Sequence, residues 1–112
     1  MGAVASLLYT SKNQDSRIIF QVLDSPFCNF ETIAYHYAKK SMKLPDVFIN
    51  FGLGILKDHF QSHPFNPFSI DMTKTVKTCK VPALFLYCEN DKVIPPENSL
   101  RILENFNHKT RF

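Results

Sequence analysis

The sequence lacks tryptophan and is poor in glycine and cysteine. Its 112 residues include three glycines and three cysteines, and no two cysteines form a C-x-x-C pair. An odd number of scattered cysteines argues against a disulfide framework and against a cysteine-based zinc site. We therefore expect reduced thiols, an intracellular and most simply cytoplasmic protein, and no metal or other cofactor.

Long apolar runs and strong charge are also missing. No stretch approaches the roughly 18 apolar residues of a membrane-spanning helix, and the first residues do not resemble a secretory signal. The formal net charge is +3, and the densest basic group is Lys39, Lys40 and Lys43. Such a group is typical of a solvated helix face, so neither a nucleic acid nor a membrane is expected as a partner.

The composition is that of a folded chain. Hydrophobic residues make up 45% of the sequence and charged residues 21%, and eleven phenylalanines are present. A chain of this composition buries a core and is not disordered, and its length permits one domain at most.

Two apolar runs predict β-strands, at about residues 18–23 and 81–88. Both are rich in β-branched and aromatic residues and nearly continuous, which is typical of strands buried on both faces. Helical spacing predicts helices at about 2–12, 29–43, 45–61 and 96–106, with Pro45 and Pro96 opening the last two. One or two helical turns are expected over 70–78, and the start of a further strand over 108–112.

The helix expected over 45–61 is apolar on two sides. One side carries Phe48, Phe51 and Ile55, and the other carries Ile49, Leu53, Leu56 and Phe60. Phe48, Phe51, Ile55 and Phe60 would suit contact with an apolar substrate group, but packing in the core is the expected role of most of these four. Gly52 and Gly54 would each weaken the helix by roughly 1 kcal/mol unless close packing or a bend requires them.

The order of these elements predicts an α/β fold. Strands separated by helices pair in parallel through crossover connections. Two interior-type strands do not complete such a sheet, which indicates that the chain is part of a larger domain.

The loop after the second strand carries the main functional signal. Residues 87–96 read YCENDKVIPP, and a helix is expected to follow. A strand end followed by x-x-N-D-x-V-I-P-P resembles the acid loop of α/β-hydrolases, most closely those of the serine aminopeptidase-like branch. The resemblance implies that Asp91 is the acid of a Ser-His-Asp triad, which orients the histidine and stabilises its protonated form. Considered alone, Asp91 could equally be an aspartate that shapes a turn or caps a helix.

The first residues fit the same family. Met1-Gly2-Ala3 before a helix resembles the end of the nucleophile turn G-x-S-M-G-A. The resemblance implies a serine directly before Met1, the Met1 amide as one oxyanion-hole donor, and Gly2 as the small residue of the tight turn. The first residues also fit M-G-x-x-x-[ST], the pattern for N-myristoylation at Gly2. Stable membrane attachment would need a second signal such as a basic cluster, and the sequence has none near Gly2.

Two triad members have no counterpart in the sequence. No serine occupies a nucleophile turn: Ser6 falls inside a helix, and Ser25 precedes a proline. The family's histidine is expected after the next strand, beyond Phe112, whereas His108 precedes that strand. Asp24, after the first strand, is the alternative acid, because some α/β-hydrolases carry the acid there.

The remaining histidines have no predicted catalytic role. His36 and His59 fall on predicted helices, and His63 lies in a proline-rich loop.

The resemblance implies a piece of a serine hydrolase that cleaves an ester, thioester or amide of a small-molecule, acyl or peptide substrate. Residues 29–78 would form a lid-like helical insertion, and the 112 residues alone would be inactive. Two alternatives remain. One is a non-catalytic binding module that pairs with another chain through an open strand edge; the other is a self-contained α/β domain unrelated to hydrolases.

Overall fold

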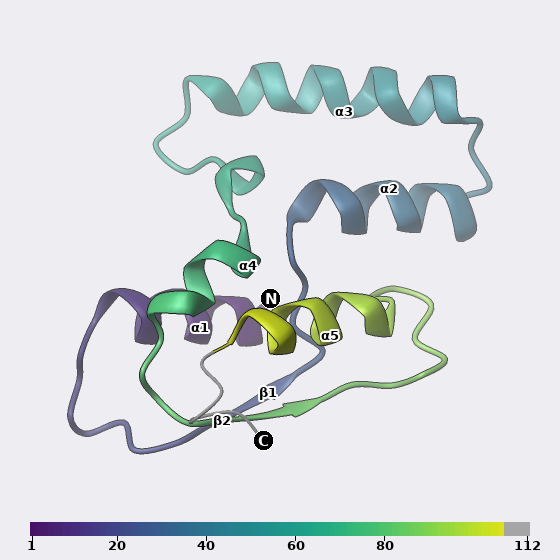
Figure 1. Cartoon of the computed structure of the whole chain (residues 1–112). Coiled ribbons are helices and arrows are strands. Elements are labelled where there is room, and N and C mark those ends of the chain that lie inside the picture. Colours follow the sequence, from purple (N-terminus) through teal and green to yellow (C-terminus); the bar gives the residue numbers. More distant parts are fainter. Residues whose placement is uncertain (107–112) are drawn as a thin grey trace. The chain divides into compact units, whose positions relative to one another are not determined.

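The computed structural model describes residues 1–106, and these residues form two compact units (Figure 1). The first unit consists of residues 1–28 and 71–106, and the second is Asn29–Ile70. The second unit therefore ends at Ile70, before the predicted end of the helical insertion at residue 78. His108 and the strand expected over 108–112 lie outside the described residues.

The first unit contains a parallel pair of strands and several helices. Its elements in chain order are α1 (Gly2–Lys12), β1 (Gln21–Asp24), α4 (Met72–Thr75), the 3-10 helix η2 (Val76–Thr78), β2 (Ala83–Leu86) and α5 (Pro96–Asn105). β1 and β2 pair in parallel with Gln21 opposite Ala83 and Asp24 opposite Leu86. The prediction of parallel strands separated by helices is confirmed, as are the helical turns expected over 70–78.

Helices cover one face of the two strands (Figure 1). Leu23 and Ala83 point into this covered side and are fully buried, and Phe85 is nearly so. The helices contribute Leu7 from α1 and Ile102 from α5, which are also fully buried. The core of this unit therefore lies between the covered face of the sheet and the helices.

The other face of the sheet is open, so the expectation of strands buried on both faces is wrong for the described chain. Burial alternates along both strands: Val22 is 57% exposed and Leu86 is 46% exposed. The strands are also shorter than predicted, because Ile18 and Ile19 precede the ladder, which begins at Gln21. An apolar run shows only that its residues are hydrophobic. It does not show which of them pair, because pairing depends on a neighbouring strand.

A buried polar cluster ties α1 to the start of β1 and to the segment before β2. The Thr10 hydroxyl donates to Gln21 Oε1 at 3.3 Å, and the Gln21 amide donates to Cys79 Sγ and to the Val81 carbonyl, each at 3.4 Å. Because Gln21 occupies an inward position, these bonds satisfy an amide that would otherwise be costly to bury.

The second unit is a pair of helices joined by a short turn. Its elements are α2 (Phe30–Lys40), α3 (Asp46–Gln61) and the 3-10 helix η1 (Pro67–Ser69). Asn29 caps α2, because its side chain accepts the Thr32 amide at 2.8 Å. α2 ends earlier than predicted: Lys43 has a left-handed backbone with φ 53°, and the Leu44 amide bonds the Ala38 carbonyl at 3.2 Å.

The two apolar sides of α3 have different environments. On one side Ile49 and Leu53 are buried and Leu56 is exposed. On the other side Phe48, Phe51 and Ile55 are all exposed, so the expected core role is wrong for these three residues. A Cβ added at Gly52 or Gly54 would contact nothing within 4 Å, so no close approach requires these glycines. None of the helices formed by residues 1–106 is both long enough and apolar enough to cross a bilayer.

Candidate functional site

The loops that follow β1 and β2 meet at one edge of the sheet. The strands are parallel, so their carboxyl ends lie side by side, and the Ser25 amide continues the ladder by donating to the Leu86 carbonyl at 2.8 Å. α1 and α5 run back against the direction of the strands, so both helices begin toward this edge (Figure 1). In open α/β sheets, ligands bind beyond the carboxyl ends of the strands.

Asp91 lies in a tight turn beyond the end of β2. Its Oδ1 accepts the Val93 amide at 2.8 Å and the Ile94 amide at 3.0 Å, and its own amide donates to the Cys88 carbonyl at 3.3 Å. This is the Asx-turn geometry typical of aspartate, and it leads into Pro95 and α5. Within the described residues Oδ2 has no hydrogen-bond partner, so the turn fixes one oxygen and leaves the other available.

Asp24 is the last residue of β1, and Ser25 follows it directly. The Ser25 hydroxyl donates to Asp24 Oδ1 at 3.1 Å, and Ser25 has a left-handed backbone with φ 49°. Asp24 is exposed, and its carboxylate accepts no backbone amide from residues 1–106. Asp24 thus ends a strand whereas Asp91 lies beyond one, and of these two carboxylates only that of Asp91 accepts backbone amides from residues 1–106.

The start of α1 is exposed and loosely packed. Met1 is 72% exposed and precedes the first helical residue, and the Ala5 amide bonds the Met1 carbonyl at 3.0 Å. A Cβ at Gly2 would contact nothing within 4 Å. The oxyanion-hole role of the Met1 amide and the elbow role of Gly2 remain predictions.

No histidine bonds Asp91 among residues 1–106. His36, His59 and His63 belong to the second unit, where the rings of His59 and His63 lie with their centroids 5.5 Å apart. Ser6 lies within α1 as predicted. In this part of the chain, no three side chains of His, Cys, Asp or Glu gather closely enough to hold a metal ion.

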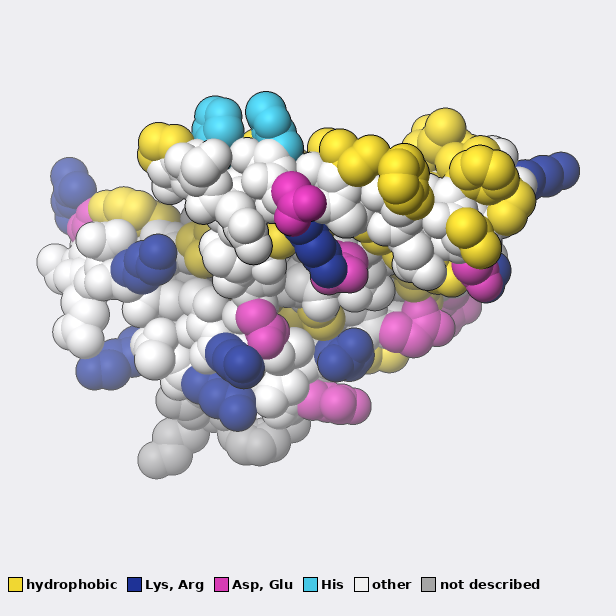
Figure 2. All heavy atoms as spheres, turned by 90° about the horizontal axis from the view of Figure 1, so that it is seen from above, with side chains coloured by type: hydrophobic (Ala, Val, Ile, Leu, Met, Phe, Trp, Pro, Cys, Tyr) yellow, Lys and Arg dark blue, Asp and Glu magenta, His cyan; other side chains and the backbone are white. Residues whose placement is uncertain are grey.

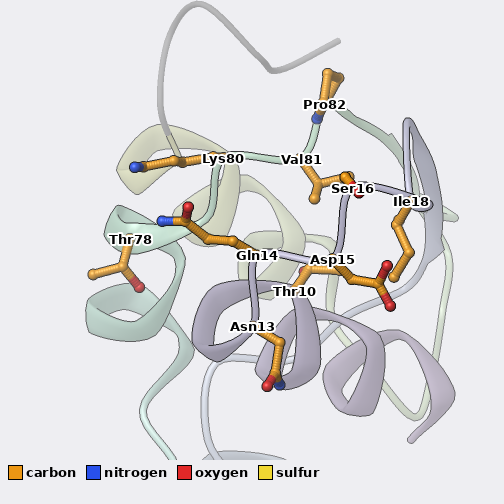
Figure 3. A pocket seen from close by; sticks show the side chains of 10 residues that line it. All are labelled: Thr10, Asn13, Gln14, Asp15, Ser16, Ile18, Thr78, Lys80, Val81 and Pro82. Atoms are coloured by element: carbon orange, nitrogen blue, oxygen red, sulfur yellow. The ribbon is translucent and has the colours of Figure 1, made fainter.

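A cavity that the sequence did not reveal opens at the opposite, amino-terminal edge of the sheet (Figure 3). It measures about 290 Å³ and is lined by residues before β1, such as Ser16 and Ile18, and before β2, such as Val81 and Pro82. Asp15 lies on its rim, where two hydrogen bonds from the Arg17 guanidinium lower the pKa of the carboxyl to about 2. Its lining comes from two stretches far apart in sequence, 10–18 and 78–82, so no local sequence pattern marks it.

The three cysteines are free thiols in different environments. Cys28 and Cys79 are buried and Cys88 is exposed. The Cys28 thiol donates to the Asn98 carbonyl at 3.3 Å, and its burial raises its pKa. Since the thiolate is the reactive form of cysteine, Cys28 is suited to packing rather than to nucleophilic chemistry.

Comparisons with models of protein families, with curated proteins and with solved structures returned no match.

Proposed function

We propose that the chain is part of a serine hydrolase of the α/β-hydrolase type, with Asp91 as the acid of its triad. One observation supports this best: Asp91 follows the carboxyl end of β2, beside the parallel strand β1, with one oxygen fixed and the other free to accept a hydrogen bond. The resemblance of the loop 87–96 to the family's acid loop is the reason for assigning Asp91 the role of triad acid.

The geometry of the turn suits the role of a triad acid. Such an acid accepts the Nδ1–H of the histidine, fixes its tautomer and stabilises the imidazolium formed when the serine attacks a carbonyl. Asp91 Oδ1 is occupied by the Val93 and Ile94 amides, so Oδ2 would accept the imidazole proton.

The serine and the histidine would be supplied from outside these 112 residues. On this proposal the serine directly precedes Met1, and the histidine follows the strand after α5. The substrate would be an ester, thioester or amide. The 112-residue chain alone should therefore show no specific labelling by a fluorophosphonate probe, and clear stoichiometric labelling would contradict the proposal.

The acid assignment is tested by Asp91→Asn in the chain extended by its own flanking coding sequence. The asparagine oxygen can still accept both backbone amides, so the turn should survive, while the labelling rate should fall by about 10⁴-fold, as expected when a triad acid loses its charge. Asp24→Asn is the matched control and should label at nearly the unsubstituted rate. If Asp24→Asn slows labelling and Asp91→Asn does not, the triad acid is Asp24. If no in-frame G-x-S precedes Met1, the whole proposal fails.

A non-catalytic module is the second candidate, favoured by the open sheet. Each strand has a single neighbour among the described residues, and Val22 and Leu86 are exposed on the uncovered face. Unpaired strand edges accept strands from other chains. Stop codons immediately flanking both ends of the coding sequence would favour this candidate over the hydrolase.

A further inference from the structure

Exposed hydrophobic side chains gather at one end of the second unit, where α2 turns into α3. We call residues 39–51 the tip. Its most exposed large apolar residues are Val47 at 77%, Phe51 at 70% and Phe48 at 66%, and Met42 in the turn is also exposed. Figure 2 shows hydrophobic side chains clustered at this end of α3, with a basic side chain beside them. Patches of this kind mark interaction sites.

The packing of α2 against α3 does not use Val47 or Phe51, whereas Phe48 borders an apolar hollow that Ala34 and Ala38 of α2 also line. Ile49 and Leu53 lie on the buried side of α3, whereas Val47, Phe51 and Ile55 recur every four residues along a different side. The exposed stripe is therefore a second apolar face, separate from the one that holds α3 to α2. The packing of α2 against α3 therefore does not explain why this stripe is apolar.

The same end of the unit is basic. Lys39, Lys40 and Lys43 are all exposed, and Asp46 is the only acidic residue in the tip. Asp46 is already engaged, because its Oδ1 lies 3.3 Å from Lys39 Nζ and accepts the Tyr35 hydroxyl at 2.8 Å. Lys40 and Lys43 form no ion pair within residues 1–106.

We propose that the tip inserts into the surface of a bilayer that contains anionic lipids. Val47, Phe48 and Phe51 would enter the boundary between headgroups and acyl chains, and the lysines would contact the anionic headgroups. Amphipathic helices bind membranes through this pairing of apolar and basic residues, lying on the bilayer without crossing it. Surface binding is compatible with the lack of a spanning helix in residues 1–106.

A bilayer fits the tip better than a second copy of the chain. Whatever covers the tip must offer both an apolar layer and negative charge, and the tip of another copy would bring its own lysines with Asp46 already engaged. No membrane partner was expected from the sequence, because no apolar run is long enough to span a bilayer and the lysines are typical of a solvated helix face. The exposure of Val47, Phe48 and Phe51 near these lysines changes that expectation. The proposal holds whether or not the chain belongs to a hydrolase.

Co-sedimentation of the 112-residue chain with vesicles tests the proposal. Vesicles of phosphatidylcholine and phosphatidylserine should bind the chain, pure phosphatidylcholine vesicles should bind it at least tenfold more weakly, and high salt should reduce the difference. Val47→Ser/Phe51→Ser should lower binding by roughly a hundredfold, because two inserted side chains are lost. Lys40→Gln/Lys43→Gln should lower it roughly thirtyfold on anionic vesicles alone.

Two matched variants control for general effects. Phe65→Ser removes an exposed phenylalanine of the same unit outside the tip, and Lys77→Gln removes an exposed lysine of the first unit; neither should change binding. Circular dichroism should show that all variants keep their helix content. The proposal fails if the chain ignores anionic vesicles, or if the controls reduce binding as much as the tip variants. It also fails if the chain self-associates without lipid and Val47→Ser/Phe51→Ser abolishes that association, because a second copy would then cover the tip.

Discussion

In the first unit Leu7, Leu23 and Ile102 are completely shielded from solvent, whereas in the second unit the larger side chains of Phe48 and Phe51 are mostly exposed. The two units have a similar supply of apolar residues but use them differently. The first arranges them in layers, with helices over one face of a parallel strand pair. The second consists of the pair α2 and α3 with the short helix η1, whose Phe68 packs against Phe30 and Phe60, and these contacts leave one face of α3 uncovered. The first unit is therefore expected to carry most of the stability, and the exposed residues of the second are available for binding.

Leu23→Ala should produce the largest effect on stability. Leu23 is fully buried on the covered face of β1, and removing a buried leucine side chain costs about 2–5 kcal/mol. Leu53→Ala in α3 is the counterpart in the second unit and should cost less, near the lower end of that range, because fewer layers surround it. Urea unfolding followed by circular dichroism gives the totals, and amide hydrogen exchange in β1 and α3 assigns each loss to a unit. Equal losses at the two sites would contradict the difference described above.

The sequence predicted the fold best where local chemistry decides the outcome. α1 spans the predicted residues, and Pro96 opens α5 as its missing amide proton allows. The strands were predicted too long and too deeply buried, because an apolar run such as 18–23 does not show whether a neighbouring strand or layer is present. The exposure of Phe51 was missed for the same reason: helical periodicity identifies an apolar face but does not show what covers it.

The candidate site was predictable in part. The turn at Asp91 follows from its own sequence, because aspartate before two backbone amides forms an Asx turn wherever the loop is tight. The left-handed backbone of Ser25 had no such signal, since serine has little preference for that conformation. Nor did the sequence indicate that Asp91 Oδ2 would be left without a partner in the described chain, because that depends on residues distant in sequence.

Gly54→Ala should stabilise the second unit without affecting the first. A Cβ at position 54 would meet nothing within 4 Å, and glycine inside a helix costs about 1 kcal/mol relative to alanine, so α3 should gain about that amount. Gly2→Ala is the control, because it lies at the frayed first position of α1 and should change stability by only a few tenths of a kcal/mol. Slower amide exchange along α3, with β1 unchanged, is the expected readout. A loss of stability would mean that α3 needs the glycine for a bend.

The smallest expected effect concerns two carboxylates, one in each unit: Asp15, which is half-buried, and Asp46, which is exposed. Hydrogen bonds from Arg17 lower the pKa of Asp15 to about 2, and a hydrogen bond from Tyr35, followed by one from Lys39, lowers the pKa of Asp46. Because both values are lower in the folded chain than the ordinary value, folding favours the ionised forms. The resulting stabilisation is complete above about pH 4 and is lost as the pH falls, for Asp15 through about 2.

Carboxyl carbon NMR titration measures both groups in one sample. Arg17→Gln should return the pKa of Asp15 toward its ordinary value and leave that of Asp46 unchanged, whereas Tyr35→Phe should do the reverse. The change in stability should be slight, because exposed ion pairs are screened by solvent. Asp15 could instead titrate with an ordinary pKa in the unsubstituted chain. That result would mean that its hydrogen bonds with the Arg17 guanidinium do not persist in solution, and that the rim of the cavity at the amino-terminal edge is less ordered than the core of the first unit.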